Sequence, residues 1–420
     1  PESVVIMLRM MSSHASSVRF RRATGSASAP KNEATLRSSH FAKGSKMKTI
    51  AHLKLIALAV TLLINAPGNA VGDDPNETKL IGYIDTSGTV VIEPAFIAAN
   101  DFSEGLAGVV PKDSDLYGII DEDGKMVVPP RFPYIGLFSH GLAPAEDKSG
   151  RVGFVDKNGD FVIPPQYYDA DEFSEGLAAI TVREMRDKRP LRKRGFVDTS
   201  GKLAIPPQFD QVGEFSEGKA LVERDKRWNY IDKNGRLLME EWVDYAYEFT
   251  ENRGPIKKNG LWEFISSDGE MVIAPSFDYV TSFHNGHAIV GLKEGREGRI
   301  IDTTGRFSTD RIFSALGEFH EGVALFRDGG ALQGIDTRGK TVIGPEKLAD
   351  VDNLPDFHEG LAAVLIKGRY GYMNKAGEVV IKPQPSFVQA ENFSCGRARV
   401  TAGRNVLWIE RVLPIRKNAE

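Results

Sequence analysis

The chain of 420 residues holds 53 Lys and Arg against 57 Asp and Glu, which gives a formal net charge of −4. Its apolar fraction of 41% is enough to bury a core, so the chain is neither collagen-like nor broadly disordered. The single cysteine, Cys395, excludes an internal disulfide framework and any zinc site built on several thiolates.

Residues 47–70 have the layout of a secretory signal peptide. Lys48 and Lys54 give a short positive start, and an apolar run extends from Leu55 to Ile64. This run is too short to span a bilayer, which takes about 20 residues. The small residues that follow end in Ala70, as at a signal-peptidase site. The alternatives are a buried core helix and an uncleaved anchor.

Residues 1–46 precede this predicted signal peptide. They are rich in Ser, Arg and Ala, begin with Pro1 rather than Met, and show no apolar period. We interpret Met47 as the start of translation and residues 1–46 as a disordered tail or a spurious upstream extension. Residues 71–78 are predicted to be a linker and residues 413–420 a C-terminal tail. The protein is then exported, to the periplasm, the cell surface or the medium.

Removal of residues 1–70 changes the net charge of the chain. From residue 71 onward the chain holds 43 basic and 55 acidic residues, a net charge of −12. An acidic surface repels phosphate backbones, which argues against nucleic acid as a general partner. No later segment is apolar enough to cross a membrane, so we expect no transmembrane segment after the signal is removed.

Residues 79–412 consist of one sequence unit that is repeated nine times. Its first anchor is a polar residue followed three positions later by glycine, and the spacings between these nine glycines are 36, 35, 42, 34, 34, 36, 34 and 38. Its second anchor is Phe-x-x-Gly, which lies 14 residues after the first in seven units. The nine turn glycines are Gly88, Gly124, Gly159, Gly201, Gly235, Gly269, Gly305, Gly339 and Gly377.

Each unit is predicted to be a meander of three short strands. In the third unit, 153–156 and 161–163 pair across a type I turn at Asp156 to Gly159. Pro164 and Pro165 end the second strand, 166–172 crosses over, and Phe173 plugs the core. The third strand, 177–180, leads to the next unit.

One meander cannot bury its own apolar face, so neighbouring units must cover it. A recurrent alanine, two residues after the Phe-x-x-Gly glycine, indicates a close approach between backbones. We predict an all-β tandem array of about nine repeats. Propellers typically have four to eight blades, which favours an open twisted array here. The alternative is a closed propeller-like ring completed by strands at 397–400 and 406–412.

At this point the sequence resembles the WG-repeat family. The unit from Gly153 to Tyr167, followed by Glu172-Phe-Ser-Glu-Gly-Leu-Ala-Ala, is similar to that family's repeat, although no Trp-Gly dipeptide occurs. Tyr117 and Tyr370 keep an aromatic before glycine, whereas Trp228 and Trp262 keep tryptophan without it. The resemblance implies a mainly bacterial family of binding repeats that shares no set of catalytic residues.

Most of the polar residues that suggest chemistry recur at turn positions. His284, His320 and His358 share one slot of the Phe-x-x-Gly turn, and His140 lies in another such turn. A row of imidazoles suits a divalent metal, but we interpret the slot as a tolerant turn position. The turn glutamates, the turn aspartates and Cys395 are interpreted in the same way. We predict no catalytic residue, no metal site and no cofactor.

The spacing of 42 marks a basic insertion at 183–194, which holds seven basic and two acidic residues. Insertions in repeats form loops that often bind partners. Arg189, Arg192, Lys193 and Arg194 are therefore candidates for contact with an acidic polymer, a membrane surface or an acidic patch. A solvated surface loop without such a role is the alternative.

Tyr117, Trp228, Trp262 and Tyr370 occupy one strand position in different units. If they face solvent, they form a row that can stack on sugars. If they face inward, they form the core between repeats, which we favour.

These observations predict an exported, non-catalytic repeat scaffold that binds a protein or polymer at the cell envelope or outside the cell. The alternative is a glycan-binding or glycan-cleaving repeat protein that uses the aromatic and carboxylate rows.

If Met47 starts translation and the signal is cleaved after Ala70, the exported protein begins at Val71 or close to it. N-terminal sequencing of the mature protein checks this, and a mature product that begins before Met47 contradicts it.

Overall fold

The computed structural model describes residues 79–186, 189–291, 297–314, 316–353, 355–384 and 386–402. The extension at 1–46, the signal at 47–70, the linker at 71–78, the strand at 406–412 and the tail at 413–420 lie outside the described residues. The described part is all-β and holds one short 3₁₀ helix, η1 (Pro345–Lys347). The predicted tandem β-repeat array is confirmed.

The first strands are β1 (Leu80–Asp85), β2 (Val90–Ala99), β3 (Leu106–Pro111), β4 (Tyr117–Asp121), β5 (Met126–Phe132), β6 (Tyr134–Ile135), β7 (Ala143–Glu146), β8 (Val152–Val155), β9 (Phe161–Tyr167), β10 (Asp169–Ser174) and β11 (Leu177–Arg186). They continue as β12 (Arg189–Asp198), β13 (Leu203–Phe209), β14 (Gln211–Ser216), β15 (Lys219–Arg224), β16 (Arg227–Asp232), β17 (Tyr245–Ala246), β18 (Gly254–Lys258), β19 (Leu261–Ile265), β20 (Met271–Phe277), β21 (Tyr279–Val280) and β22 (His287–Gly291). The last are β23 (Glu297–Asp302), β24 (Phe313–Ser314), β25 (Val323–Asp328), β26 (Ala331–Asp336), β27 (Thr341–Ile343), β28 (Leu361–Ile366), β29 (Arg369–Asn374), β30 (Val379–Ile381), β31 (Phe387–Ala390) and β32 (Arg397–Ala402).

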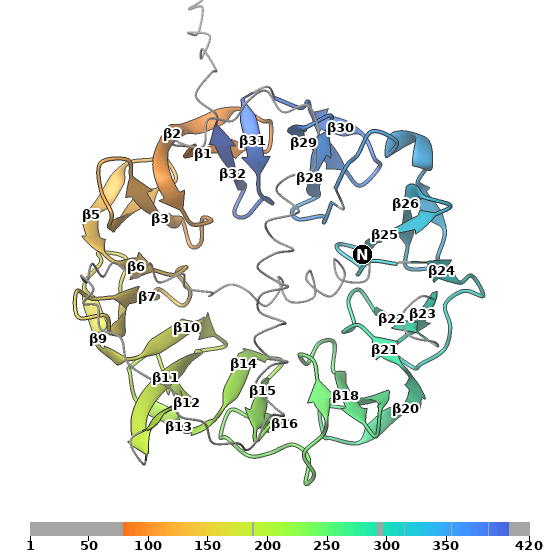
Figure 1. Ribbon diagram of the computed structural model, residues 1–420, viewed down its shortest axis with the longest axis horizontal. Helices are drawn as coiled ribbons and strands as arrows, with labels where there is room; N and C mark the ends of the chain where they lie inside the picture. Colours follow the sequence, from red (N-terminus) through yellow and green to blue (C-terminus); the bar gives the residue numbers. More distant parts are fainter. Residues whose placement is uncertain are drawn as a thin grey trace, which may run out of the picture. The chain divides into compact units, whose positions relative to one another are not determined.

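The strands form small antiparallel sheets that stand side by side as the blades of a ring (Figure 1). A complete blade, such as β6-β7-β8-β9, runs in chain order from the centre of the ring to its rim. Other blades have three strands, as in β14-β15-β16. The next blade begins again at the centre, as β10 does after β9.

The ring is closed by strands from the two ends of the repeat region. β32 pairs with β1 along its whole length, from Leu80 opposite Ala402 to Asp85 opposite Arg397. The antiparallel sheet β31-β32-β1-β2-β3-β4-β5 therefore joins the last two strands of the described repeats to the first strands. The open array favoured above is wrong, and the closed ring holds. The first unit lacks inner strands of its own, and pairing with the last unit satisfies the edge of β1 that an open array would expose.

Two details of the predicted unit are also corrected. The segment after the prolines does not merely cross over, because 169–174 forms β10, the innermost strand of its blade. Pro164 and Pro165 do not end the second strand, since β9 continues through them to Tyr167. β9 is the outermost strand of its sheet, and a proline on an edge strand removes no ladder hydrogen bond.

Glycines allow close approaches within and between blades. A Cβ atom on Gly153 of β8 would lie 2.3 Å from the carbonyl oxygen of Ile163 on the paired strand. Gly159, with φ of 78°, turns the chain between those two strands. A Cβ atom there would lie 2.9 Å from Val128 of the preceding blade. The repeated turn glycine thus lets each blade pack directly against the one before it.

The core lies between successive blades. Phe173 is buried, and its ring centre lies 4.8 Å from that of Phe154 in the preceding blade. Phe215 packs in the same way on Phe196, also at 4.8 Å. The recurrent alanines, none more than 1% exposed, are Ala107, Ala143, Ala178, Ala220, Ala288, Ala324, Ala362 and Ala398. The predicted core plug at Phe173 is confirmed, and the recurrent alanines are buried.

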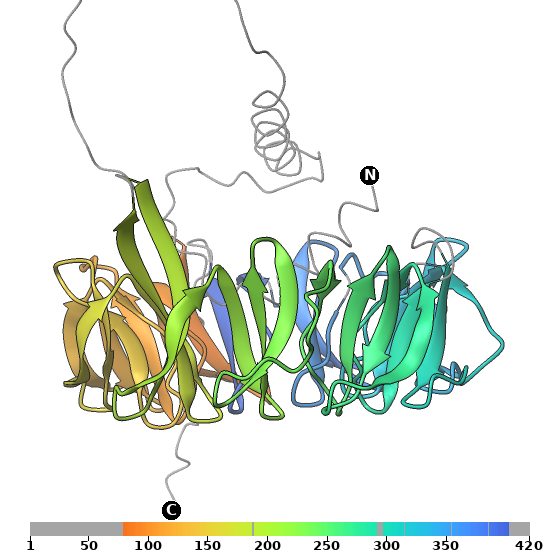
Figure 2. The same ribbon diagram turned by 90° about the horizontal axis from the view of Figure 1, so that it is seen from below.

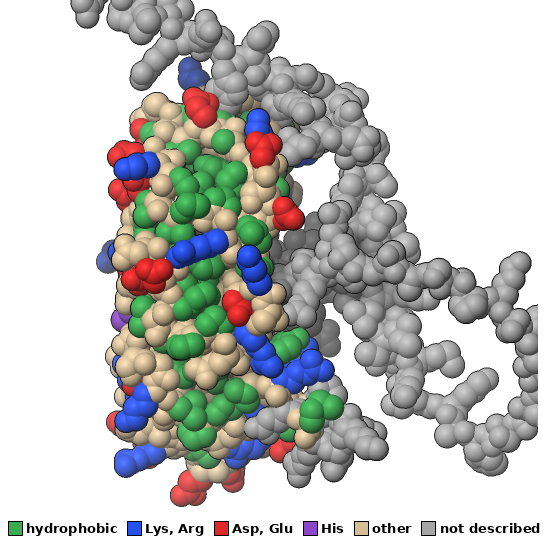
Figure 3. Space-filling model, turned by 90° about the vertical axis from the view of Figure 1, so that its left-hand side faces the viewer, with side chains coloured by type: hydrophobic (Ala, Val, Ile, Leu, Met, Phe, Trp, Pro, Cys, Tyr) green, Lys and Arg blue, Asp and Glu red, His purple; other side chains and the backbone are tan. Residues whose placement is uncertain are grey.

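The outermost strands place apolar side chains on the rim. Phe161 and Val162 begin β9 and are 36% and 50% exposed, and Leu203 at the start of β13 is 47% exposed. Figure 3 shows hydrophobic side chains along the middle of the rim, with charged side chains towards its borders. Prolines in β5, β9 and β13 reduce the main-chain donors that these edges offer to another strand.

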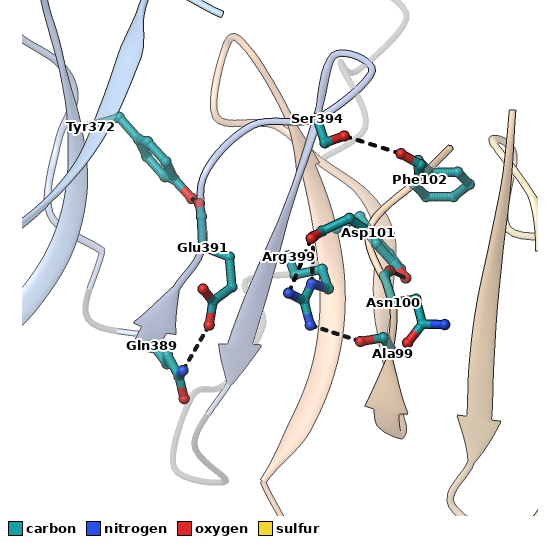
Figure 4. A network of polar contacts seen from close by, with 10 residues as sticks. Ala99, Asn100, Asp101, Phe102, Tyr372, Gln389, Glu391, Ser394 and Arg399 are labelled. Atoms are coloured by element: carbon teal, nitrogen blue, oxygen red, sulfur yellow. Dashed lines mark hydrogen bonds and ion pairs between the residues drawn. The ribbon is translucent and has the colours of Figure 1, made fainter. Parts of the chain in front are cut away.

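A polar network fastens the closing strand (Figure 4). Arg399 of β32 donates from Nε to Asp101 at 2.6 Å and from Nη1 to the carbonyl oxygen of Ala99 at 2.8 Å. Ser394 donates its hydroxyl hydrogen to the carbonyl oxygen of Phe102 at 3.1 Å. These contacts join residues almost 300 positions apart, so the last unit is bonded to the first by side chains as well as by strand pairing.

Replacing Arg399 with Ala should destabilise the ring, because it removes three hydrogen bonds of a partly buried cation and leaves Asp101 and the Ala99 carbonyl without that partner. We expect a loss of about 1–3 kcal/mol in the free energy of unfolding, measured by urea denaturation. Arg227→Ala, which breaks an exposed pair with Asp244, is the matched control and should cost at most about 1 kcal/mol. Equal losses in the two variants would contradict the closing role of Arg399.

Candidate functional site

The two faces of the ring carry different connections. Phe-x-x-Gly turns join the two innermost strands of a blade, and Asp-x-x-Gly turns join its two outermost strands. Because the strands are antiparallel, both kinds of turn lie on one face, which we call the turn face. The hairpins between the two middle strands, such as β7–β8 and β11–β12, lie on the opposite face, which we call the hairpin face.

On the turn face, the repeated glutamates bind the next blade. Glu175 has φ of 50°, and with Gly176 it makes a two-residue hairpin in which both residues have positive φ. Its carboxylate accepts the N–H of Gly218 in the next turn at 3.0 Å and pairs with Lys233 at 3.1 Å. Partial burial by itself raises the pKa of Glu175, but the bonds from Lys233 and Gly218 outweigh it, so the pKa is lowered. Equivalent bonds come from Glu104, Glu217, Glu251, Glu321 and Glu359.

The serine slot of the same turn also joins neighbouring blades. Ser103, Ser139 and Ser174 each donate a hydroxyl hydrogen, at 2.6 Å, to the carbonyl oxygen of the phenylalanine one blade further on. The turn aspartates close their own turns, since Asp156 Oδ1 accepts the N–H groups of Asn158 and Asp160, both at 2.9 Å. These polar rows therefore have structural partners.

Histidine replaces serine in three consecutive turns, and a shallow cavity of about 520 Å³ lies there. It is lined by His284, His320 and His358 together with turn glutamates. The ring centres of His320 and His358 lie 5.9 Å apart. Among the residues that the structure describes, no three His, Cys, Asp or Glu side chains are placed to hold a metal ion.

The four aromatic residues that share one strand position in different units pack into the blades. They are Tyr117, Trp228, Trp262 and Tyr370. Trp262 is 4% exposed and stacks on Tyr247, with ring centres 4.6 Å apart. Tyr117, Trp228 and Tyr370 are half-buried, and each packs against the core of its blade. The structure thus places these residues in the inward arrangement rather than in a solvent-facing row.

The basic insertion forms part of a long hairpin. β11 and β12 have 10 residues each and pair from Leu177–Asp198 out to Arg186–Arg189. β10, which pairs with the inner side of β11, stops pairing at Thr181. β13, which pairs with the outer side of β12, stops pairing at Arg194. The outer part of the hairpin therefore stands alone and projects beyond the hairpin face, as the tall yellow-green ribbon in Figure 2 shows.

The predicted basic residues of this hairpin have different surroundings. Lys193 pairs with Asp210 at 2.5 Å, and Arg194 pairs with Asp171 and donates to the carbonyl oxygen of Val212. Both cations thus have carboxylate partners inside the domain. Arg189 opens β12 at the far end of the hairpin, opposite Arg186.

Arg192 is exposed and has an aromatic partner. Its guanidinium lies 4.4 Å from the ring centre of Tyr168 and donates to the Tyr168 hydroxyl at 2.7 Å. Arg183 is also exposed, and its guanidinium lies 5.9 Å from the same ring centre. Tyr168 was missed by sequence reasoning, because its contact with the insertion depends on how β10 and β11 pair.

Carboxylates at the inner strands were also not identified from the sequence, although they recur at a fixed position of the repeat. An acidic residue directly precedes the turn phenylalanine in six of the nine units, at Asp101, Glu172, Glu214, Glu248, Glu318 and Asp356. Burial raises the pKa of Glu172. Loss of contact with water and repulsion from Glu172 and Glu248 raise the pKa of Glu214. The inner strands of three successive blades therefore bring like charges together.

No helix of the described residues is long and apolar enough to cross a membrane. Cys395 is exposed and occupies the glutamate slot of the ninth turn, with φ of 53°.

Comparison with known proteins identifies the repeats. The family described as "WG containing repeat" matches residues 81–113, 117–149, 153–184, 195–228, 230–262, 264–294, 300–330 and 370–403. No curated protein matches the sequence.

Among solved structures, the chain is similar to BamB from Moraxella catarrhalis, with 13% identity and a TM-score of 0.39 over 64% of this chain and 96% of that one. It is also similar to a eukaryotic initiation factor, with 13% identity and a TM-score of 0.43 over 66% and 84%. The WD40 beta propeller domain of Doa1 matches with 13% identity and a TM-score of 0.26 over 63% and 93%. Likeness this low carries no functional conclusion.

Replacing Glu214 with Gln should stabilise the domain at neutral pH. The pKa of this carboxyl is raised above its ordinary value of 4.5, so its ionised form costs stability as the pH rises through and above that range. The variant should melt a few degrees higher than the parent at pH 7, and the gain should vanish below about pH 4, where the carboxyl is protonated. Glu240→Gln, in an exposed loop, is the control. A gain that persists in acid would show that charge repulsion is not its source.

Proposed function

This chain belongs to the family of WG containing repeat proteins, and we propose that it is an exported, non-catalytic scaffold that binds a protein partner at the cell envelope or outside the cell. The proposal is that the ring supplies a rigid base and the β11–β12 hairpin supplies the contact. Export rests on the signal-like pattern of residues 47–70.

The projecting hairpin is the observation that carries this proposal. Its strands have 10 residues each, whereas the corresponding strands β15 and β16 of the next blade have 6 each. The extra length adds no strand pairing with the rest of the blade, because the neighbouring strands stop pairing at Thr181 and Arg194. A two-stranded ribbon that projects into water gains less packing than strands inside a blade for the same conformational cost, so a bound partner is a physical reason for its length.

The glycan alternative is supported less well by the geometry. Trp262 is buried and its three counterparts are half-buried against their cores, so they offer few ring faces for stacking on sugars. The repeated glutamates accept main-chain N–H groups of the next blade, which explains their recurrence without a catalytic pair. We therefore do not propose a glycan-cleaving activity.

The experiment removes the hairpin and keeps the blade. Residues 183–192 are replaced by Asn-Gly, which joins the cross-strand partners Val182 and Lys193 through a two-residue turn. Parent and shortened proteins are used to capture partners from the envelope fraction of the source cells, and captured proteins are identified by mass spectrometry. We expect the shortened protein to melt like the parent and to lose the partners that the parent retains.

A matched control removes charge elsewhere. Lys202 and Arg236 lie in exposed turns at the other end of the strands, so Lys202→Gln with Arg236→Gln lowers the positive charge of the turn face and leaves the hairpin intact. This variant should capture the same partners as the parent. Equal capture by the shortened protein, or turnover of a sugar bound on a glycan array, would overturn the proposed function.

A further inference from the structure

Two arginines face each other on the projecting hairpin. Arg183 and Arg192 are direct cross-strand partners, and both guanidinium groups lie against the ring of Tyr168. Like charges directly opposite each other destabilise a strand pair. Among the side chains that the structure describes, no carboxylate pairs with either arginine, whereas the adjacent Lys193 and Arg194 have Asp210 and Asp171.

Tyr168 orients this arginine pair. The Tyr168 hydroxyl accepts a hydrogen from Arg192 at 2.7 Å, and the ring face lies under both guanidinium groups. Holding the two cations on one aromatic ring reduces the side-chain entropy that a ligand would otherwise have to freeze. Planar guanidinium groups held in this way are suited to carboxylates, which they bind through paired N–H donors.

Beside the arginine pair, none of the described strands pairs with the inner edge of β11 beyond Thr181. The N–H of Tyr168 donates to the carbonyl oxygen of Thr181, so the main chain of Thr181 is directed away from β12. Main-chain direction alternates along a strand, and Arg183 and Met185 therefore present their N–H and C=O groups on the same side. The pairing of β10 with β11 ends at Thr181, and Met185 is 68% exposed.

We propose that this edge of β11 and the arginine pair together bind an acidic segment of a partner protein in extended conformation. The segment adds as a strand beside Arg183 and Met185, and its carboxylates pair with Arg183 and Arg192. This inference rests on the proposed function and names the chemistry of its partner.

A polypeptide fits this site better than other polyanions. Free main-chain donors and acceptors recognise another main chain, which a polysaccharide or a lipid headgroup does not supply. From residue 71 onward the chain carries a net charge of −12, which repels an extended anionic surface. A short acidic segment touches only the hairpin, which projects beyond the rest of the hairpin face.

The test uses the full chain and a fluorescein-labelled peptide of alternating Glu and Thr, with binding followed by fluorescence anisotropy. Arg183→Gln with Arg192→Gln should weaken binding by about tenfold or more, because both charged partners are lost. Lys202→Gln with Arg236→Gln removes the same charge from the turn face and should leave the affinity within about twofold of the parent. Rising salt should weaken binding to the parent.

The main-chain part of the proposal needs its own variant. Met185→Pro removes an outward N–H, and the opposite residue, Pro190, is already a proline, so the β11–β12 ladder should persist. We expect severalfold weaker binding. A peptide of alternating Glu and Pro carries the same charge but cannot pair as a strand, so it should bind the unchanged protein weakly and gives the same information without altering the fold.

Each outcome decides the proposal. Equal affinity of parent and arginine variants, or equal binding of the Glu-Thr and Glu-Pro peptides, overturns it. So does the absence of peptide binding while vesicles of anionic phospholipid or a sulfated polysaccharide bind the hairpin. If the hairpin-shortened protein loses its partners but no acidic peptide binds the parent, the inference fails and the proposed function stands.

Discussion

Mutual cover between successive blades is the constraint on which the whole structure depends. A blade of three or four short strands has an apolar face that it cannot bury alone, and the turn phenylalanine of the next blade fills that face. The turn glycines allow the blades to approach, and the turn glutamates and serines bond across the same boundary. Every blade needs a neighbour on both sides. The pairing of β32 with β1 builds one shared blade, whose core residues pack on β28–β30 on one side and on β3 and β4 on the other, and an open array would lack this cover.

The repeated part of this architecture could be predicted from the sequence, because a fixed spacing of turn glycine and phenylalanine reports a repeated local structure. The strands at 153–156 and 177–180, the plug at Phe173 and the buried alanines were identified in this way. Ring closure was not, since it depends on the angle between neighbouring blades, which no residue pattern states. The predicted end of the strand at Pro164 and Pro165 was wrong for a related reason. A proline ends a central strand but is accepted on an edge strand, and only the whole sheet shows that β9 is an edge strand.

The candidate site was found where the sequence departs from its own period. The long spacing of 42 residues located the hairpin, and its basic composition indicated an acidic partner. Composition could not show which of these cations already have a carboxylate partner. Lys193 pairs with Asp210 after β13, and Arg194 pairs with Asp171 on β10, and neither partner is near its cation in the sequence. Arg183 and Tyr168 became part of the site only through the register of β11 with β10 and β12. Residues that recur in every unit serve the ring, and the functional proposal rests on residues that occur once.

Hydrogen exchange across the closing sheet tests the central claim most directly. In the closed ring, the main-chain groups of β1 lie between β2 and β32, so amides at 80–85 should exchange as slowly as those of an interior strand such as β8. The outermost strands β9 and β13, each with one free edge, provide the fast reference within the same molecule. Exchange of 80–85 at the rate of those edge strands would show that β32 leaves β1 unpaired, and the account of a ring that covers its own ends would be wrong.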